Sequence, residues 1–439
     1  MKEEKDGVKK CLSILIINNY FPPEIGAASH LYYYLAKNLV KRGHSVTILT
    51  GIPRYNVSRD LYERYLTKFG GKRFIIENDD GIEIIRVKLP FVERSQLIRR
   101  GLEHFEIAFK MFFYTKKLLK ERNIDVSLVY SPPLSLYWSA YKIKNLKEAP
   151  FILNVQDLFP QAAIDLGAIR NPILIRFFRY LEKIAYKKAD IITVHSERNK
   201  IFVESVVKQS GKVLVMENWV DENEIVPGKK ENDFSIKHNL TGKFVVSFAG
   251  TLGFSQDAEV ILKAASELRD YKDIVFVIVG DGVGIKEAKL LINELQLTNV
   301  LLIPPVPREE YPLVLNSSDI SLATLKNNVR TPVVPSKILS IMSAGIPVVA
   351  SMNLDGDAPE LIKKANAGFC VPAGDYKALS EKILLLYKTP SLRETLGKNG
   401  RKYIEEHLSS GKAAEKYEQL FFEILSNKRR QENGLSEIL

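Results

Sequence analysis

The chain of 439 residues is longer than a typical single domain, and its 46% hydrophobic residues are enough for more than one core. Its 63 Lys and Arg residues outnumber 52 Asp and Glu, a net charge of +11 that we interpret as broadly spread and suited to nucleotide phosphates, an acidic lipid surface or nucleic acid. The two cysteines, Cys11 and Cys370, exclude a disulfide framework and fit a reducing cytosol, and we find neither a signal peptide nor an apolar run that could span a bilayer.

The first half of the chain alternates short buried strands with helices, which is the pattern of a parallel α/β sheet. We predict strands at residues 11–18, 45–50, 82–88, 126–130, 151–155, 190–195 and 212–216, and helices at 27–42, 170–188 and 196–208. The loop NNYFPPEIGAAS carries one glycine, Gly26, and not the GxGxxG of a dinucleotide site. Gly26 therefore either lets the backbone approach a ligand at a helix N-terminus or belongs to a plain turn. Residues 51–81 are less regular and rich in Tyr, Arg and Lys.

A long helix at 93–123 carries apolar residues at helical spacing, surrounded by basic side chains. The apolar positions are Ile98, Leu102, Phe105, Phe109 and Phe112. A basic amphipathic helix can lie on an anionic membrane, but a core-facing helix with a solvated back shows the same pattern. Both interpretations hold together if only residues 94–100 and nearby aromatic rings touch lipid. We therefore expect Arg94, Arg99 and Arg100 to face a membrane.

A polar stretch with Pro and Gly at 222–243 follows, and we interpret it as an interdomain linker. The alternation then restarts, with strands predicted at 244–249, 274–279, 300–303, 320–324, 346–350 and 368–371 and a last amphipathic helix at about 411–426. The expected domains are residues 1–221 and 244–408, and residues 409–439 are expected to pack back on the N-terminal domain. The predicted fold class is α/β, with two Rossmann-like domains facing across a deep cleft at the carboxyl ends of their strands.

The stretch PSKILSIMSAGIPVVA, residues 335–350, predicts a short helix, a glycine stop and a buried strand. Ser336 is placed to cap the helix, and Gly345 suits its end. Pro347 suits the start of a strand, where a missing donor is tolerated. The helix N-terminus and Lys337 can be presented to a phosphate, although an ordinary capped helix explains the same residues.

Several segments, taken in order, resemble family 4 of the retaining glycosyltransferases, which have the two-domain GT-B architecture. They are YFPPEIGAASHLYYYLAKNLVKRGHSVTILT, SPPLSLYWSA, APFILNVQDLFPQ, MENWVD, FAGTLGFSQD, IVGDGVG and PSKILSIMSAGIPVVAS. Within that family, the likeness is greatest to the branch of bacterial fucosamine and colanic-acid-type transferases. The resemblance implies transfer of a sugar from a nucleotide diphosphate sugar, expected to be UDP-linked, to an acceptor hydroxyl with retention at the anomeric carbon.

The resemblance also places the donor on the C-terminal domain and the acceptor on the N-terminal domain. It implies donor contacts at residues that match the family's motifs, which are Gly26, Thr251, Gly253, Asp281, Val306, Ser336 and Lys337. Lysines, backbone N–H groups and a helix N-terminus can stabilise the departing nucleotide diphosphate without a metal. We therefore expect no metal and no other cofactor, although Asp355-Gly356-Asp357 resembles the DxD of a different transferase fold. Glu360, where the next helix begins, is expected near the donor sugar.

The chain departs from the family at two positions where much of the family has glutamate. Pro332 and Ser340 stand there, and a serine can form hydrogen bonds but cannot supply charge. The donor loop GTLGFSQD also lacks the Arg and Lys that are common in the family. We expect Lys326 and Arg330, together with Lys337, to bind the diphosphate instead.

Asp157 follows the strand at 151–155 and is the residue that we expect to act on the acceptor. It either orients the acceptor hydroxyl and helps to accept its proton, or caps the short segment 161–164. The expected acceptor is a lipid-linked saccharide of cell-surface polysaccharide or glycolipid assembly, at the cytoplasmic face of the cell membrane. The alternatives are a catalytically silent GT-B partner or scaffold, suggested by the missing glutamates, and a sugar-nucleotide epimerase. We expect no nucleic acid partner, since no RNA- or DNA-binding module is recognisable.

Overall fold

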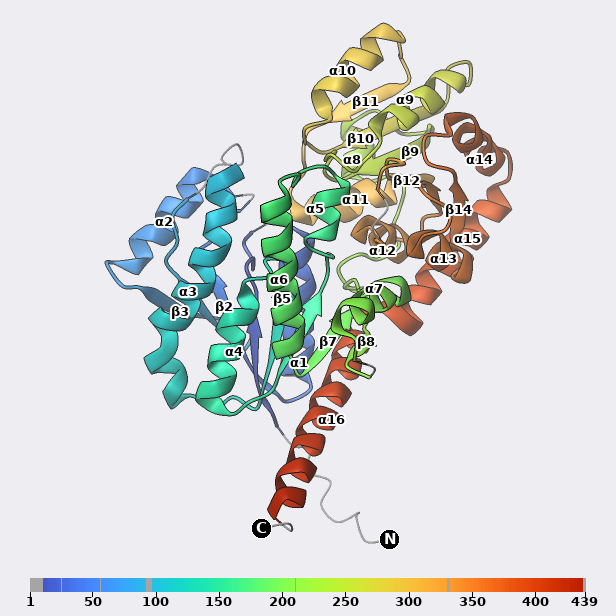
Figure 1. Cartoon of the computed structure of the whole chain (residues 1–439). Helices are drawn as coiled ribbons and strands as arrows, with labels where there is room; N and C mark the ends of the chain where they lie inside the picture. Colours follow the sequence, from blue (N-terminus) through green and yellow to red (C-terminus); the bar gives the residue numbers. More distant parts are fainter. Residues whose placement is uncertain are drawn as a thin grey trace. The chain divides into compact units, whose positions relative to one another are not determined.

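The computed structural model describes residues 11–24, 26–55, 57–91, 97–209, 211–329 and 332–436. It divides into two compact units, each built on its own sheet (Figure 1). The first unit comprises Met1–Pro160, Asn171–Glu217 and Ser410–Leu439, and the second comprises Gln161–Arg170 and Asn218–Ser409.

The first unit is built on an eight-stranded sheet in the order β3-β4-β2-β1-β5-β6-β7-β8. Its strands are β1 (Ser13–Ile17), β2 (Ser45–Gly51), β3 (Phe74–Asp79), β4 (Ile82–Val87), β5 (Val126–Ser131), β6 (Phe151–Val155), β7 (Ile191–Val194) and β8 (Val213–Val215). Neighbouring strands run parallel, except for the antiparallel pair β3 and β4. The central strands β5 and β6 are buried along their whole length, because helices cover both faces of a parallel sheet.

The helices of the first unit connect these strands and cover the two faces of the sheet (Figure 1). They are α1 (Ala27–Lys41), α2 (Arg59–Phe69), α3 (Leu97–Glu121), α4 (Leu136–Lys147), α6 (Pro172–Lys188), α7 (Glu197–Val207) and α16 (Ser410–Ser436). The connection through α1 leads from β1 to β2, whereas α3, α4 and α6 lead in the opposite direction, to β5, β6 and β7. Because such crossovers are right-handed, α3, α4 and α6 share the face opposite α1, and Figure 1 shows them side by side.

Two elements occur in the segment 51–81, which looked irregular in the sequence. The helix α2 is capped by Ser58, whose side chain accepts a hydrogen bond from Leu61 N. Its inward side carries Tyr62, Tyr65, Leu66 and Phe69 at helical spacing, a pattern that the sequence analysis missed among the Tyr, Arg and Lys residues of the segment. The strand β3 lies at the edge of the sheet and none of its residues is buried, so it lacks the long apolar run of an inner strand.

The second unit is built on a six-stranded parallel sheet in the order β11-β10-β9-β12-β13-β14. Its strands are β9 (Phe244–Ala249), β10 (Ile274–Val279), β11 (Val300–Ile303), β12 (Ile320–Thr324), β13 (Val348–Ser351) and β14 (Gly368–Val371). Its helices are α5 (Gln161–Asp165), α8 (Asp233–Lys237), α9 (Ala258–Glu267), α10 (Ile285–Glu294), α11 (Tyr311–Asn316), α12 (Ser336–Ser343), α13 (Asp357–Lys364), α14 (Tyr376–Lys388) and α15 (Pro390–Tyr403). The strand β13 begins at Val348, so Pro347 lies just before the strand and not within it.

The segment 222–243 is not a linker, because it belongs to the second unit. It contains α8, which has a capping box formed by Asn232 and Ser235. Phe234 is buried in this segment, and Lys230 Nζ lies 2.5 Å from Asp319 Oδ2. The polar residues that suggested a linker therefore cap a helix and pair with the body of the unit.

The C-terminal helix α16 packs against α1 within the first unit. Asn38 Nδ2 donates to Ser410 Oγ at 3.0 Å, and both Arg42 and His44 contact the Glu418 carboxylate. The buried Tyr417 reaches the sheet, where its hydroxyl accepts a hydrogen bond from Asn154 Nδ2 at 3.0 Å. This helix therefore completes the core of a unit whose other segments lie far earlier in the chain.

Candidate functional site

The carboxyl ends of β9, β10 and β12 lie at one edge of the second sheet, and backbone hydrogen bonds join the loops that follow them. Leu252 N donates to Asp281 O, and Lys326 N donates to Ser255 O, both at 2.9 Å. These bonds bring together predicted donor residues from three loops, which are Thr251, Gly253, Asp281 and Lys326. Ligands of open parallel sheets bind at this end of the strands.

Glycines allow the first two of these loops to lie in direct backbone contact. Gly280 has φ +149°, and a Cβ placed on it would lie 2.0 Å from Gly250 O. Gly282 has φ +142°, and a Cβ there would lie 2.3 Å from Leu252 O. Only glycine is compatible with both the backbone conformation and the space, so these positions shape the edge of the sheet.

The helix α12 begins near this edge, with Pro335 in the N-cap position and Ser336 as its first residue. No side chain caps α12, so the prediction that Ser336 is the cap is wrong. A residue inside the first turn has helical backbone angles, and its side chain is not placed to accept from the next N–H groups. Ser336 is exposed at the helix N-terminus, where the backbone carries positive partial charge.

Lys337 follows in the first turn of α12, and its ammonium group is buried in the second unit. Its Nζ has no hydrogen-bond partner among the described residues. It lies 3.7 Å from the centre of the Phe248 ring on β9, and a Cβ placed on Gly250 would lie 3.6 Å from it. Burial lowers the pKa of Lys337 to about 7.

The position of Lys337 is electrostatically unfavourable unless an anion is bound. It adds a positive charge to the positive end of a helix, and the first turn of α12 has no acidic side chain. A buried charge is costly when nothing of opposite sign is near it. The residues of this edge therefore form a site suited to an anionic group such as a diphosphate.

Ser340, one turn further along α12, is engaged within the second unit. A hydrogen bond to Ser340 lowers the pKa of Tyr311, although burial has the larger effect and raises it. The Ser340 hydroxyl also lies 3.5 Å from the Ser336 carbonyl oxygen. The position at which much of the family has glutamate is thus occupied by a neutral side chain in contact with a half-buried tyrosine.

The remaining predicted donor residues have simple surroundings. Thr251, Asp281, Lys326 and Glu360 are exposed on the second unit. Val306 is half-buried and packs on a small core cluster of the same unit. Arg330 lies outside the described residues.

Asp157 follows β6 in the first unit, as the sequence predicted. Its side chain is accessible to solvent, and its carboxylate accepts no hydrogen bond from the described residues. The surrounding protein nevertheless desolvates this carboxyl in part, which raises its pKa. A carboxylate that is free to accept a proton and has a raised pKa suits a role towards an acceptor hydroxyl, and that role stays a prediction.

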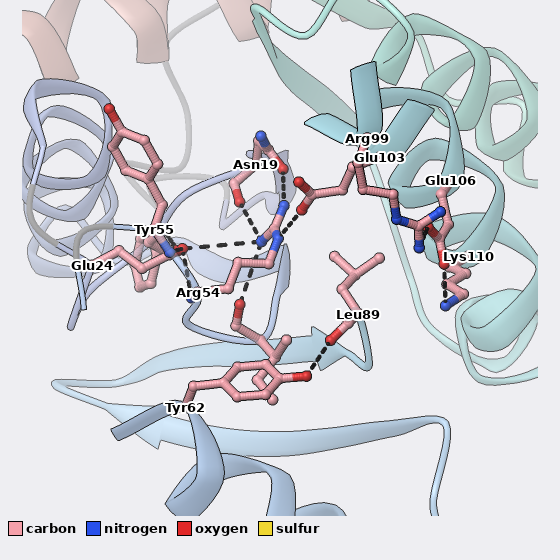
Figure 2. A network of polar contacts seen from close by, with 12 residues as sticks. Asn19, Glu24, Arg54, Tyr55, Tyr62, Leu89, Arg99, Glu103, Glu106 and Lys110 are labelled. Carbon is pink, nitrogen blue, oxygen red and sulfur yellow. Dashed lines mark hydrogen bonds and ion pairs between the residues drawn. The ribbon is translucent and has the colours of Figure 1, made fainter. Parts of the chain in front are cut away.

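A buried polar cluster at the ends of β1 and β2 was missed by the sequence analysis (Figure 2). Arg54 pairs with Glu103 of α3, and its Nη2 donates to Asn19 Oδ1 at 2.6 Å. Glu24 accepts hydrogen bonds from the backbone N–H groups of Arg54, at 3.0 Å, and Tyr55, at 2.9 Å. Burial opposes the charge of Arg54, but Glu103 and Glu24 outweigh it and raise the pKa of Arg54. This cluster fixes the loop that leads to α1.

The sequence signal for this cluster was present but weak. The loops that follow the strands carry charged residues, which indicates a polar cluster at the carboxyl ends of the strands. Their pairing with Glu103, 49 positions further along the chain, is visible only in the fold. Gly26, in the same loop, has an extended backbone at φ 171°, and a Cβ there would lie 3.8 Å from Tyr55. Neither the backbone conformation nor the space around Gly26 in the first unit requires a glycine. A close approach of the Gly26 backbone to the diphosphate therefore stays a prediction.

Two of the three predicted membrane-facing arginines, Arg99 and Arg100, belong to the first turns of α3. Arg99 is exposed and pairs with Glu106 at 3.2 Å. Arg94 lies outside the described residues, and of Arg100 only the helical backbone is described. Within the described residues, the helices include none that is long and apolar enough to cross a membrane.

Two family models match this chain, one for each unit. The family described as "Glycosyl transferase 4-like domain" matches residues 26–219, and "Glycosyl transferases group 1" matches residues 229–403. The chain belongs to family 4 of the glycosyltransferases. The second match begins inside the segment 222–243, in agreement with its place in the second unit.

Curated relatives of this family 4 glycosyltransferase come from bacteria. The probable glycosyltransferase WbjE of Pseudomonas aeruginosa is 27% identical over 299 residues, covering 67% of this chain and 74% of that protein. The putative colanic acid biosynthesis glycosyl transferase WcaI of Escherichia coli is 22% identical, covering 76% and 82%. The UDP-Gal:alpha-D-GlcNAc-diphosphoundecaprenol alpha-1,3-galactosyltransferase of E. coli is 26% identical, covering 57% and 65%.

Solved structures show the same fold at lower sequence identity. Sucrose-phosphate synthase from Thermosynechococcus elongatus has a TM-score of 0.73 and 16% identity, over 95% of this chain and 100% of that chain. HepE of Anabaena in complex with UDP has a TM-score of 0.66 and 14% identity, over 94% and 100%. These likenesses establish the GT-B fold, with two Rossmann-like α/β domains.

Proposed function

We propose that this glycosyltransferase moves a sugar from a UDP-linked donor to a hydroxyl of a lipid-linked saccharide, with retention at the anomeric carbon. The reaction serves cell-surface polysaccharide or glycolipid assembly at the cytoplasmic face of the membrane. The observation that carries the proposal is the buried Lys337 ammonium, which has no partner among the described residues and lies at the N-terminus of α12.

In this proposal Lys337 binds the diphosphate of the donor. When the bond between the anomeric carbon and the phosphate oxygen breaks, its electrons remain on the departing nucleotide diphosphate. A buried ammonium group and a helix N-terminus stabilise that charge more than water does, because the surrounding protein screens them less. Glycines at the same edge let a ligand approach the backbone closely.

The choice of donor and acceptor rests on the relatives. The E. coli galactosyltransferase is named for a UDP-linked donor and a diphosphoundecaprenol-linked acceptor, and the HepE structure contains UDP. For the acceptor we propose Asp157 of the first unit, which orients the hydroxyl and helps to accept its proton.

Transfer assays with UDP-, GDP- and TDP-linked sugars and diphosphoundecaprenol-linked saccharides test this function. We expect turnover with a UDP-sugar, and NMR of the product identifies an axial or equatorial linkage. Asp157→Asn should retain UDP binding and lose most of its turnover. Binding of nucleotides without turnover on any acceptor would favour a catalytically silent partner protein, and conversion of the donor alone would favour an epimerase.

A further inference from the structure

Among the described residues, β3 is the longest of the strands that lie at the edges of the two sheets. It has six residues, whereas β8 has three and β11 and β14 have four each. An edge strand leaves a row of backbone groups unpaired, and proteins usually protect such edges by shortness, proline or a bulge. The strand β3 contains no proline, and its register with β4 has no bulge. Its centre is apolar, and Ile76 is 45% exposed.

The hairpin of β3 and β4 fixes which backbone groups of β3 are unpaired within the sheet. Its turn is Asp80-Gly81, and both residues have positive φ, of +50° and +80°. Lys88 N donates to Arg73 O at 2.9 Å, so the backbone of Arg73 is turned towards β4. Because this direction alternates along an antiparallel strand, every second residue from Arg73 onwards pairs with β4. The N–H and C=O groups that point away from the sheet therefore belong to Phe74, Ile76 and Asn78.

A groove with a volume of about 810 Å³ lies beside this strand. The consecutive residues 74–77 of β3 line it, together with Lys68 of α2 and Tyr114 of α3. Lys68 pairs with Glu77 at 3.2 Å, and the Arg73 guanidinium lies 5.5 Å from the centre of the Tyr114 ring. The space beside the edge is large enough to take side chains of another strand, and its walls are held by contacts within the first unit.

The charges around β3 are arranged so that the strand complements itself. The segment KRFIIENDD, residues 72–80, has a basic start, an apolar centre and an acidic end. When two copies pair in antiparallel order about Ile76, Arg73 of each copy lies opposite Asp79 of the other. Opposite charges at facing positions stabilise a pair of strands, and two-fold symmetry makes this pair occur twice. Asp80 already pairs with Lys37 at 2.5 Å, so Arg73 and Asp79 are the charges that matter most.

The backbone and the charges select the same register. In this register the outward groups of Ile76 meet those of Ile76 in the other copy, and those of Phe74 meet Asn78, with two hydrogen bonds for each such pair. A shift of one residue would place outward groups against groups that already pair with β4. A shift of two residues would place Arg73 opposite Glu77 or Gly81 and leave Asp79 without a basic residue opposite it.

We propose that two copies of this chain associate through β3, so that the sheets of their first units join into one continuous antiparallel pairing. The occupant is a second copy and not a peptide of another protein, because the charge pattern of the edge complements itself. The net charge of +11 opposes association, but charges further apart than about 8 Å are largely screened at physiological ionic strength. The inference goes beyond the proposed transfer reaction and uses neither Asp157 nor any donor-site residue.

Sedimentation velocity of the full chain tests the association. We expect a species of twice the chain mass of 49.8 kDa. Ile76→Lys places two like charges opposite each other at the two-fold axis and should weaken the dimer by about tenfold or more. Ile201→Lys is the matched control, because Ile201 is 65% exposed on α7 of the same unit, and it should leave the dimer unchanged. A wild type that stays monomeric at micromolar concentration, or equal dimers in both variants, would overturn the proposal.

An exchange of charges tests the register. Arg73→Asp places a carboxylate opposite Asp79 of the second copy, and Asp79→Arg places a guanidinium opposite Arg73, so each variant alone should dimerise poorly. A mixture of the two variants should form a mixed dimer, because both facing pairs then have opposite charges again. The double variant, Arg73→Asp with Asp79→Arg, should dimerise as the wild type does. Variants that stay monomeric when they are mixed would overturn the proposal.

Hydrogen exchange detects the backbone pairing itself. The N–H groups of Phe74, Ile76 and Asn78 should exchange slowly in the wild-type dimer and fast in the Ile76→Lys variant. Exchange of this strand that does not differ between the two proteins would overturn the pairing through β3. Because no step needs a nucleotide or turnover, failure here would leave the proposed reaction standing.

Discussion

At the scale of a single residue, Lys337 links pH to both stability and ligand binding. Burial lowers its pKa from 10.5 to about 7, so the unfolded chain binds more protons than the folded chain between these values. The free energy of unfolding should therefore rise with pH from about 7 to 10.5, by up to about 1.4 kcal/mol per pH unit. Urea denaturation from pH 7 to pH 10 measures this rise. The Lys337→Met variant should be more stable than the wild type at pH 7, and its free energy of unfolding should lack this rise with pH.

Binding of a nucleoside diphosphate should show the opposite trend, because only the protonated amine attracts the phosphates. We expect the affinity for UDP to fall by up to about tenfold per pH unit above pH 7.5. Calorimetric titrations at pH 7.5, 8.0 and 8.5 measure the change. Lys337→Met should bind UDP weakly and without this pH dependence. Lys326→Met, whose amine is exposed, should keep the dependence. A Lys337→Met protein that binds UDP as the wild type does would remove Lys337 from the site.

Two neighbouring glutamates of α3 provide a second test at this scale. Glu103→Ala removes a carboxylate from the buried Arg54, and leaving a buried charge with fewer partners costs about 3–5 kcal/mol. Glu106→Ala removes the half-buried partner of Arg99 and Lys110, and each of these surface pairs is worth at most about 1 kcal/mol. Urea denaturation compares the two. Similar losses of stability in both variants would mean that the Arg54 cluster does not hold the first unit together.

At the scale of an element, the loops after β9 and β10 depend on glycine. Gly280→Ala places a Cβ within 2.0 Å of the Gly250 carbonyl oxygen, so the loops must separate. We expect a loss of more than about 3 kcal/mol in the free energy of unfolding and weaker UDP binding. Gly374→Ala is the matched control, with φ +79° and nothing within 4 Å of the added Cβ. Its cost should be the strain alone, about 1 kcal/mol, with UDP binding unchanged.

At the scale of the whole molecule, α16 returns to the first unit after the chain has built the second. A chain that ends at Ser409 loses Tyr417 and Phe421, which are both fully buried. Their burial alone contributes about 3–6 kcal/mol, so the first unit should unfold while the second keeps its UDP affinity. Limited proteolysis with mass spectrometry distinguishes the two units. A control that ends at Arg430 keeps both residues and should resist proteolysis as the full chain does.

Much of the fold follows from local sequence. Inner strands such as β6 and β9 have the predicted bounds, because a strand buried on both faces is an unbroken apolar run. The edge strand β3 and the short helix α8 do not stand out, since their residues face water or cap a helix. Residues 222–243 of the second unit looked like a linker because their polar side chains cap a helix and do not form an apolar pattern.

The candidate site also combines features that follow from local sequence with features that only the fold decides. The sequence by itself determined that Lys337 lies in the first turn of the helix after β12, and the order of strands and helices determined which loops share an edge of the sheet. Only the tertiary structure decided that its amine is buried over Phe248, that Glu103 meets Arg54, and which side of α3 faces water. These are contacts between residues far apart in the chain. Local pattern records that a side chain is apolar or charged, and packing decides what it touches.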